Sequence, residues 1–455
     1  MAGYATLVRR PGFLSFVLAG AFAYAAPLVV NVVLAWSIAV AYPGVGAASS
    51  FVALALVLNG LSATVPTLAS ALFAGALADR ARRRRLMLGA NAVLIAAAAG
   101  LVLDLAVLPT TGIPFPGPAG FFLPTWLVLA FPLYAAVTVS TTIFRPAYNA
   151  SIPKFAPKEE LGRANALVYA LAIAFGVAAS VVATGLIPVA GFGPGVAIAL
   201  ALALGVGTQF ALQLTPGTID EAPTRRPTKF SSDVVEGYRY LARQPALLQL
   251  TLGSLAINFL TAMATVQLAL YARAWLGVAP DQALLYGLLF GVATVGSGVG
   301  IFLISFIPFE RRAGRVLLLL IVGQGITFAL LGLVRSVPFA LVDIFLFGLF
   351  PGMGQTVFLA TVQARVPNEL LGRVFAADEV GSYAFMPVGQ AAGGYATLLT
   401  GAVQVTFLLS GVLTATTGGI LSLSRSLRNL TMYPASAALP PEGAINPRPP
   451  EPRGA

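Results

Sequence analysis

The feature of this sequence that most constrains its fold is a series of long apolar runs. A helix needs about 20 consecutive, mostly apolar residues to cross the hydrocarbon core of a bilayer, and runs of this length recur along nearly all of the 455 residues. The first six runs cover residues 13–41, 50–77, 86–108, 121–143, 164–188 and 194–214. The second six cover residues 248–275, 283–307, 314–334, 338–360, 373–399 and 402–424. The pattern predicts an all-α membrane protein with twelve transmembrane helices.

Composition supports a membrane location for the chain. Hydrophobic residues make up 58% of the sequence, charged residues only 9%, and the mean hydropathy is +0.88. A formal net charge of +11 would suggest a nucleic-acid partner in a soluble protein. Polytopic membrane proteins, however, collect Lys and Arg in their cytoplasmic loops. We therefore attribute the positive charge to cytoplasmic loops and expect no nucleic-acid partner.

The apolar runs divide the chain into four parts. We expect an N-terminal six-helix bundle at 1–214, a cytoplasmic linker at 215–247, a C-terminal six-helix bundle at 248–424 and a disordered cytoplasmic tail at 425–455. In the linker, Val234, Val235, Tyr238 and Leu241 recur at helical spacing. This spacing predicts a short amphipathic helix that lies on the inner leaflet.

Charge placement predicts the orientation. An arginine-rich cluster follows the second run, and most other cations fall in connections on the same side; only Arg273 and Arg335 fall on the opposite side. Because cations accumulate in cytoplasmic loops, both termini are expected in the cytoplasm of a multi-pass protein of the bacterial inner (plasma) membrane.

Several classes of chemistry are excluded by residues that are missing. The sequence has no Cys and no His, which removes disulfides, thiol chemistry and imidazole metal ligands, and it has no phosphate-binding loop. We expect no enzyme activity, no metal and no cofactor. Any proton must be carried by a carboxylate.

One motif resembles a known signature. The segment from Gly75 to Arg85 reads Gly-Ala-Leu-Ala-Asp-Arg-Ala-Arg-Arg-Arg-Arg, and its order resembles the loop between helices 2 and 3 of the major facilitator superfamily, although Arg82 stands where that family has a second Gly. A weaker copy contains Glu310 and Arg311. The predicted gate residues are Gly75, Asp79, Arg80, Arg83, Arg84, Arg145, Glu310 and Arg311. The resemblance implies that Asp79 braces helices 2, 4 and 11, with Arg145 as its natural partner.

An internal repeat supports two related halves. Pro157-Lys-Glu-Glu-Leu-Gly-Arg163 precedes the fifth run and Pro367-Asn-Glu-Leu-Leu-Gly-Arg373 precedes the eleventh, with the Pro, Glu, Leu, Gly and Arg at the same spacing. Repeated halves are typical of secondary transporters. We expect two pseudo-symmetric six-helix bundles, with Gly162 and Gly372 equivalent.

The resemblance extends beyond these motifs. The segments Phe144–Pro153 and Glu160–Leu167 are similar to the region after helix 4 in the branch that holds bacterial drug and macrolide exporters, the enterobactin exporter and the lysophospholipid transporter. This similarity implies the major facilitator fold, a central cavity and alternating access.

Carboxylates within the runs are candidates for coupling. Asp378 and Glu379 are adjacent in the eleventh run and have no counterpart in the fifth. They either carry a proton or recognise a cation, or they cap the inner gate by pairing with Arg80, Arg83 or Arg145, an interpretation that their position near the inner surface favours. We expect Asp104 and Asp343 to be wetted near the outer ends of their helices, where Arg335 could pair with Asp343.

Neutral polar and aromatic residues at membrane depth are candidates for the cavity lining. They are Tyr24, Asn31, Asn59, Tyr134, Asn258, Gln267 and Gln355. The alternative is that each makes an interhelical hydrogen bond, worth on the order of 1 kcal/mol.

The function these features favour is a monomeric secondary transporter that exports amphipathic molecules of the multidrug, macrolide or siderophore type in exchange for protons. A Pro and Gly segment at Met386–Gly394, similar to the antiporter kink of helix 5, favours antiport although it lies in helix 11. A lysophospholipid transporter or flippase is the alternative. A third possibility is a non-transporting scaffold or sensor. The double repeat and the gate motifs argue against it, because a scaffold needs no alternating cavity.

Overall fold

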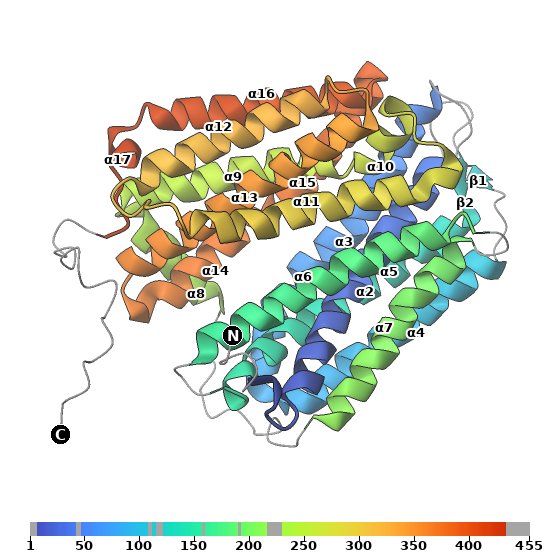
Figure 1. Ribbon diagram of the computed structural model, residues 1–455, viewed down its shortest axis with the longest axis horizontal. Coiled ribbons are helices and arrows are strands. Elements are labelled where there is room, and N and C mark those ends of the chain that lie inside the picture. The colour runs from blue at the N-terminus through green and yellow to red at the C-terminus, as the bar shows by residue number, and fades with distance from the viewer. Residues whose placement is uncertain are drawn as a thin grey trace, which may run out of the picture.

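The computed structural model describes seven segments of the chain. These are residues 7–41, 47–107, 112–114, 122–156, 160–189, 193–215 and 230–433. Within them, long helices dominate and form two side-by-side groups (Figure 1). The first group contains α2 (Phe13–Ala41), α3 (Ala47–Arg80), α4 (Arg83–Val107), α5 (Thr125–Asn149), α6 (Leu161–Leu186) and α7 (Pro194–Leu214), with the short η1 (Ile152–Lys154) after α5. We call it the N-terminal half.

The second group, the C-terminal half, follows the linker helix α8 (Phe230–Ala242). It contains α9 (Pro245–Thr265), α10 (Leu268–Leu270), η4 (Tyr271–Trp275), η5 (Pro280–Gln282), α11 (Ala283–Ile304), α12 (Ala313–Leu331), α13 (Val337–Arg365), α14 (Asn368–Ala384), α15 (Met386–Thr400), α16 (Val403–Ser422) and α17 (Arg425–Arg428).

Eleven helices in the described segments are long and apolar enough to cross a membrane. The twelfth predicted helix, at 373–399, is divided into α14 and α15, with a break at Phe385. Pro387 has no backbone N–H and its ring obstructs the preceding turn, so it sits at the start of α15 rather than inside a continuous helix. The predicted all-helical class is confirmed. One unpredicted exception is a short antiparallel pair, β1 (Gly112–Pro114) and β2 (Phe122–Pro124).

The two halves use the same pattern of helix packing. In the N-terminal half α2 packs on α6 and α7, and α4 packs on α5 and α7, while α3 packs on α5. In the C-terminal half α9 packs on α15 and α16, and α12 packs on α13 and α16, while α11 packs on α13. These pairs correspond one to one when α9, α11, α12, α13, α15 and α16 take the places of α2, α3, α4, α5, α6 and α7. The two halves also contact each other symmetrically: α3 packs on α15, and their counterparts α11 and α6 pack on each other.

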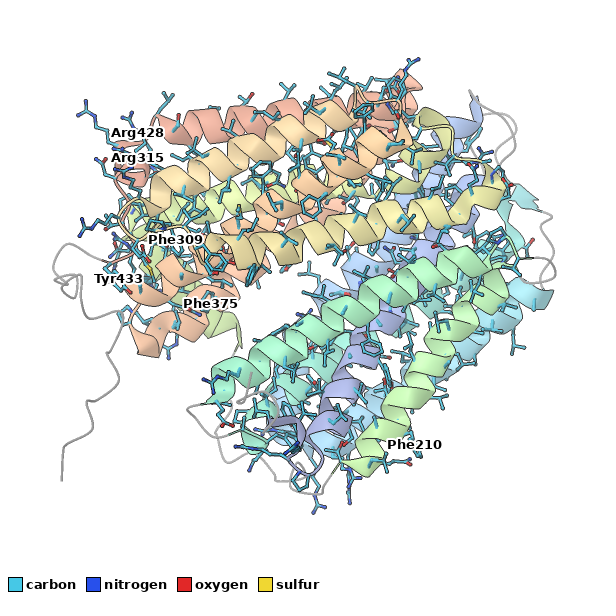
Figure 2. All side chains as sticks on the ribbon, in the orientation of Figure 1. Phe210, Phe309, Arg315, Phe375, Arg428 and Tyr433 are labelled. Atoms are coloured by element: carbon cyan, nitrogen blue, oxygen red, sulfur yellow. The ribbon has the colours of Figure 1, made fainter. Side chains whose placement is uncertain are left out.

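The halves meet at one end and diverge toward the other (Figure 1). They meet at the end that carries β1 and β2, which we call the strand end. At the opposite end lie α17 and exposed cations such as Arg311, Arg315 and Arg428. Figure 2 shows Arg315 and Arg428 projecting from this end, which we call the cationic end.

The linker helix α8 forms where the periodicity predicts it, and it packs against α14. A Cβ atom on Gly237 would overlap the backbone carbonyl of Arg373, so this crossing needs a glycine. The Arg373 Nη1 atom donates to Glu236 Oε1 at 2.6 Å. Val235 remains 56% exposed, so one face of α8 meets α14 and another faces outward.

Candidate functional site: a cavity in the C-terminal half

A cavity with a volume of about 710 Å³ lies within the C-terminal half. Its walls come from α9, α11, α12, α13, α14 and α16. The polar lining residues are Ser254, Asn258, Thr261, Thr294, Ser297, Gln324, Gln355 and Asp378. The aromatic lining residues are Phe347, Phe350, Phe358, Phe375 and Tyr383. We call this space the main cavity. An apolar wall with a few convergent polar groups is typical of a small-molecule site.

A second cavity of about 230 Å³ lies between the halves, and we call it the interface cavity. Both cavities are lined by Ala293, Thr294 and Phe347, so they adjoin along α11 and α13. Asn31 of α2 and Asn59 of α3 supply amides from the N-terminal half. The Asn59 Nδ2 atom donates to Asn31 Oδ1 at 3.5 Å.

The candidate lining residues therefore have different surroundings. Asn258 and Gln355 line the main cavity, and Asn31 and Asn59 line the interface cavity. Gln267 lines neither; it is fully buried, and its Nε2 atom donates to the Ala53 carbonyl at 3.2 Å across the two halves.

The two candidate tyrosines lie apart from both cavities. Tyr134 is buried in the core of the N-terminal half. The Tyr24 ring lies 5.7 Å from the Arg145 guanidinium, and its hydroxyl donates to Asn149 Oδ1 at 3.5 Å.

Two glutamines line cavities without having been singled out from the sequence. The Gln324 Nε2 atom, in the main cavity, donates to Thr261 Oγ1 at 3.2 Å. Gln390, in the interface cavity, accepts a 3.0 Å hydrogen bond from Thr64 Oγ1 of the other half. Both could have been identified from the sequence by the criterion that identified Gln355, because an amide within an apolar run must find a polar partner.

Of the adjacent carboxylates, Asp378 lines the main cavity. The Ser254 hydroxyl of α9 donates to Asp378 Oδ1 at 3.5 Å. The side chain of Glu379 lies outside the described part of the structure, so the arrangement of the pair stays a prediction.

The predicted gate motif lies at the cationic end. Gly75, Asp79 and Arg80 belong to the last turns of α3, and their side chains lie outside what the structure describes. Only residues 81 and 82 separate α3 from α4, so the connection is shorter than the apolar runs suggested. Whether Asp79 pairs with Arg145 therefore stays a prediction.

Two arginines that follow the motif, Arg83 and Arg84, donate within the N-terminal half. Arg83 Nη1 donates to the Ala150 carbonyl at 2.9 Å, and Arg84 Nη2 donates to the Leu212 and Gln213 carbonyls at 3.3 and 3.0 Å. These arginines thus join α4 to the ends of α5 and α7 in this conformation.

The weaker motif copy lies in the α11–α12 connection. The backbone carbonyl of Glu310 accepts from the Met432 N–H at 2.7 Å, and the Arg311 side chain is exposed. The chain that follows α17 is therefore anchored to this connection.

Two carboxylates were expected to be wetted, and this expectation is wrong. Asp104 of α4 is 4% exposed and Asp343 of α13 is 6% exposed. Among the described residues, none offers a hydrogen bond to any of their four carboxylate oxygens. The suggested partner Arg335 instead lies over the Trp275 ring, 4.3 Å from its centroid. A position near a helix end does not reveal which way the side chain faces, and both residues face their own bundle.

Close packing seals the strand end. Trp36 of α2 and Tyr286 of α11 stack across the halves with ring centroids 5.4 Å apart. A Cβ on Gly287 would overlap Thr184 Oγ1 of α6, and one on Gly394 would overlap the side chain of Val57 of α3. The site is thus closed at the strand end by contacts that only small residues permit.

Comparisons with known proteins agree with this geometry. A family model described as Major Facilitator Superfamily matches residues 12–389. Among curated proteins, the chain is similar to the uncharacterised MFS-type transporter YfiS of Bacillus subtilis (strain 168), with 26% identity over 211 residues. The match covers 44% of this chain and 48% of that relative, so the chain spans about half the length of the curated relative it matches.

The chain is also similar in fold to solved structures of three transporters with different named substrates. One is a peptide transporter, POT, in complex with sulfate, with a TM-score of 0.68, 13% identity, and coverage of 93% of this chain and 96% of that chain. Another is a nucleoside transporter, NupG, with a TM-score of 0.64, 12% identity, and coverage of 90% and 99%. The third is the xylose transporter XylE from E. coli in an inward open conformation, with a TM-score of 0.61, 12% identity, and coverage of 92% and 98%. At these identities the likeness concerns the fold alone.

Proposed function

Because the chain belongs to the major facilitator superfamily, a family of secondary transporters, we propose that it exports amphipathic small molecules by alternating access in exchange for protons. The observation that carries this proposal is the main cavity. Its volume of about 710 Å³ suits a bulky ligand, and it combines amide and hydroxyl groups with five aromatic side chains. The named substrates of the structural relatives are sugars, peptides and nucleosides, and the low identities give no reason to transfer them.

The charge distribution supports a cytoplasmic assignment for the cationic end. Arg83, Arg84, Arg145, Arg311 and Arg428 all lie there, whereas Arg273 and Arg335 lie at the strand end. Since Lys and Arg collect in cytoplasmic loops, we assign the cationic end to the cytoplasm. With this orientation the packed strand end faces outside, and the halves diverge toward the cytoplasm.

Alternating access requires the strand-end contacts to separate while the cationic end closes. The motif residues Gly75, Asp79 and Arg80 lie on the α3 segment that would approach α14 in that movement. We assign to them, and to Arg145, control of conformation rather than contact with the substrate. Asp378 and Glu379 on α14 are our candidates for the coupling proton.

An apolar groove favours the lipid alternative. It has a volume of about 480 Å³ between α3 and α15 and is lined by Leu54, Val57, Val388, Ala391, Ala392, Gly394, Tyr395 and Leu398. A groove in this position, along membrane-spanning helices, could guide the acyl chain of a lysophospholipid toward the interface cavity.

The deciding experiment is transport by proteoliposomes that contain the full chain. An imposed proton gradient should drive accumulation of dyes or macrolides, and the double variant Asp378→Asn, Glu379→Gln should lose this accumulation while it retains downhill substrate exchange. Exchange survives because it does not require the empty carrier to bind a proton. Equal gradient-driven transport in both proteins would exclude the pair from coupling. Transport of lysolipid alone would favour the alternative function.

A further inference from the structure

We infer that Asp343 is a proton-binding site that must take up a proton from solvent at the strand end before that end can close. This inference rests on the proposed function and deepens it, because it adds a second proton-binding position to the candidates Asp378 and Glu379. Asp343 lies in the second turn of α13 and is 6% exposed. Among the described residues, none hydrogen-bonds to either of its carboxylate oxygens and none forms an ion pair with it.

The titratable neighbours of Asp343 do not neutralise it. Tyr271 of η4 lies close enough to interact with Asp343 electrostatically, but the Tyr271 hydroxyl donates to the Leu331 carbonyl at 2.8 Å. On α11, which packs on α13, the Tyr286 ring stacks on Trp36 of the other half. Neither tyrosine carries a positive charge that could balance an ionised carboxylate.

The cations of the C-terminal half are engaged elsewhere. Arg335 lies over the Trp275 ring, 4.3 Å from its centroid, and Arg273 donates to the Val278 carbonyl at 2.9 Å. The ionisable residues of α12 and α14, which also pack on α13, belong to stretches nearer the cationic end. These residues are Arg315, Glu369, Arg373, Asp378, Glu379 and Tyr383.

These surroundings favour the neutral form of Asp343 in the closed strand end. Removal of an ionised carboxylate from water without a partner costs far more free energy than removal of a neutral carboxyl group. Closure therefore requires that the carboxylate first bind one proton, which forms an O–H bond. Water supplies this proton, and it receives the proton again when the site is wetted.

The position of Asp343 explains why opening would wet it. Leu331, Ile344 and Phe407 line the interface cavity, which lies between the halves. The first accepts the Tyr271 hydrogen bond, the second is adjacent to Asp343 in sequence, and the third packs its ring 4.5 Å from the Tyr271 ring. One layer of side chains thus separates Asp343 and Tyr271 from a space that widens when the strand-end contacts separate.

The segment that carries Tyr271 is irregular and is tied to the other half. The Leu276 N–H donates to the Tyr271 carbonyl, five residues back, at 3.1 Å, so η4 is a π-helical turn, a feature common at functional sites. It follows the break between α9 and α10, where Gln267 donates to the Ala53 carbonyl of the N-terminal half at 3.2 Å. Movement of that half therefore acts directly on the segment next to Asp343.

Spin labels test the link between the proton and closure. Cysteines introduced at Val189 and Asp281 place one label on each half, at exposed positions of the strand end. Because the closed state holds one more proton than the open state, the ratio of closed to open molecules should fall by up to about tenfold per pH unit as the pH rises. The label distance in the purified full chain should increase accordingly. Asp343→Asn, which cannot ionise, should keep the short distance at every pH.

Asp104→Asn is the matched control. Asp104 is equally buried and its oxygens also lack a hydrogen bond from the described residues. However, α4 packs on α3, α5 and α7 of its own half, and no α4 residue belongs to the described lining of either cavity. This variant should follow the unmodified protein. A distance that does not change with pH in the unmodified protein, or an unchanged pH dependence in Asp343→Asn, would overturn the inference. Asp343→Leu, which also cannot ionise, gives the same test if the amide variant aggregates.

Infrared spectroscopy detects the proton itself. Exposed carboxylates are ionised at about pH 7, so carbonyl absorption of a neutral carboxyl group at this pH reports a buried acid. The unmodified protein should show this absorption, Asp343→Asn should lose part of it, and Asp281→Asn, which alters an exposed carboxylate, should not. Absorption that is unchanged in Asp343→Asn would contradict the assignment.

Transport distinguishes this inference from the function on which it rests. If proteoliposomes export dyes or macrolides against a proton gradient while the label distance is independent of pH, the transporter stands and the role of Asp343 falls. If closure depends on pH through Asp343 but no compound of the panel is moved, the proton site stands and the proposed export falls.

Discussion

At the residue scale, the glycines of α11 show how a missing side chain sets the distance between helices. Gly296 and Gly300 face the backbone of α13, where a Cβ would overlap the carbonyls of Phe345 and Leu349. Gly287 instead faces Thr184 across the two halves, and Gly298 has no neighbour within 4 Å of a built Cβ. The same residue type therefore serves internal packing, contact between halves, or neither.

Gly287→Ala is expected to hold the strand end apart. The added methyl would collide with Thr184 Oγ1, and overpacking of this kind costs about 1–3 kcal/mol, or roughly a 5- to 150-fold change in the equilibrium between closed and open states. Because the sequence has no native Cys, spin labels on Cys introduced at Val189 and Asp281 would report the separation directly. The distance should increase and transport should slow.

The matched control is Gly298→Ala on the same helix, where a Cβ meets no neighbour. It should leave both the label distance and transport unchanged. An unaltered distance in Gly287→Ala would show that this contact does not limit closure.

At the scale of elements, the packing of α8 on α14 ties the linker to the half-helix that carries Asp378. Contact is close at Gly237, which faces the Arg373 carbonyl, and it is supplemented by the ion pair of Arg373 with Glu236. An exposed ion pair contributes at most about 1 kcal/mol, so the backbone contact is the stronger determinant of docking.

Gly237→Ala and Gly372→Ala are predicted to change stability in opposite directions. The first forces α8 away from the Arg373 carbonyl, and we expect a cost of about 1–3 kcal/mol. The second places a methyl where a Cβ meets no neighbour and should stabilise α14 by up to about 1 kcal/mol, because Ala favours helix more than Gly does. Thermal unfolding in detergent would measure both. Equal shifts would mean that α8 does not dock as described.

At the scale of the whole molecule, orientation follows from the distribution of cations. Single cysteines at Asp281, exposed at the strand end, and at Arg312, exposed at the cationic end, need no background removal, since the natural chain contains no Cys. With the cationic end in the cytoplasm, an impermeant thiol reagent should label the first in intact cells and the second only after permeabilisation. The reverse result would invert the proposed topology and the direction of opening.

Much of the fold could be predicted because a bilayer leaves a chain few alternatives. Backbone groups in hydrocarbon must be hydrogen-bonded within the segment, so apolar runs of sufficient length become helices, and eleven of the predicted spans are present as such. Pro387 indicated a break in this helix, which the structure places at Phe385. The backbone geometry that divides α14 from α15 depends on neighbouring helices as well as on Pro387. The packing of Gly389 and Gly393 against the backbone of Phe259 and Met263 is one such contact.

The sequence by itself determined the membrane location, eleven of the spans and their order, and the relation between the halves. It could do so because length, apolar content and spacing are properties of a single chain segment. Only the tertiary structure decided that Asn258 and Gln355 share the main cavity with Asp378, that Gln267 and Tyr134 do not line it, and that Asp104 and Asp343 are buried. The rotation of a helix about its axis and the identity of its neighbours arise from packing between segments far apart in the chain. Residue type alone therefore predicts that a polar group needs a partner, while the assembled bundle decides which partner it has.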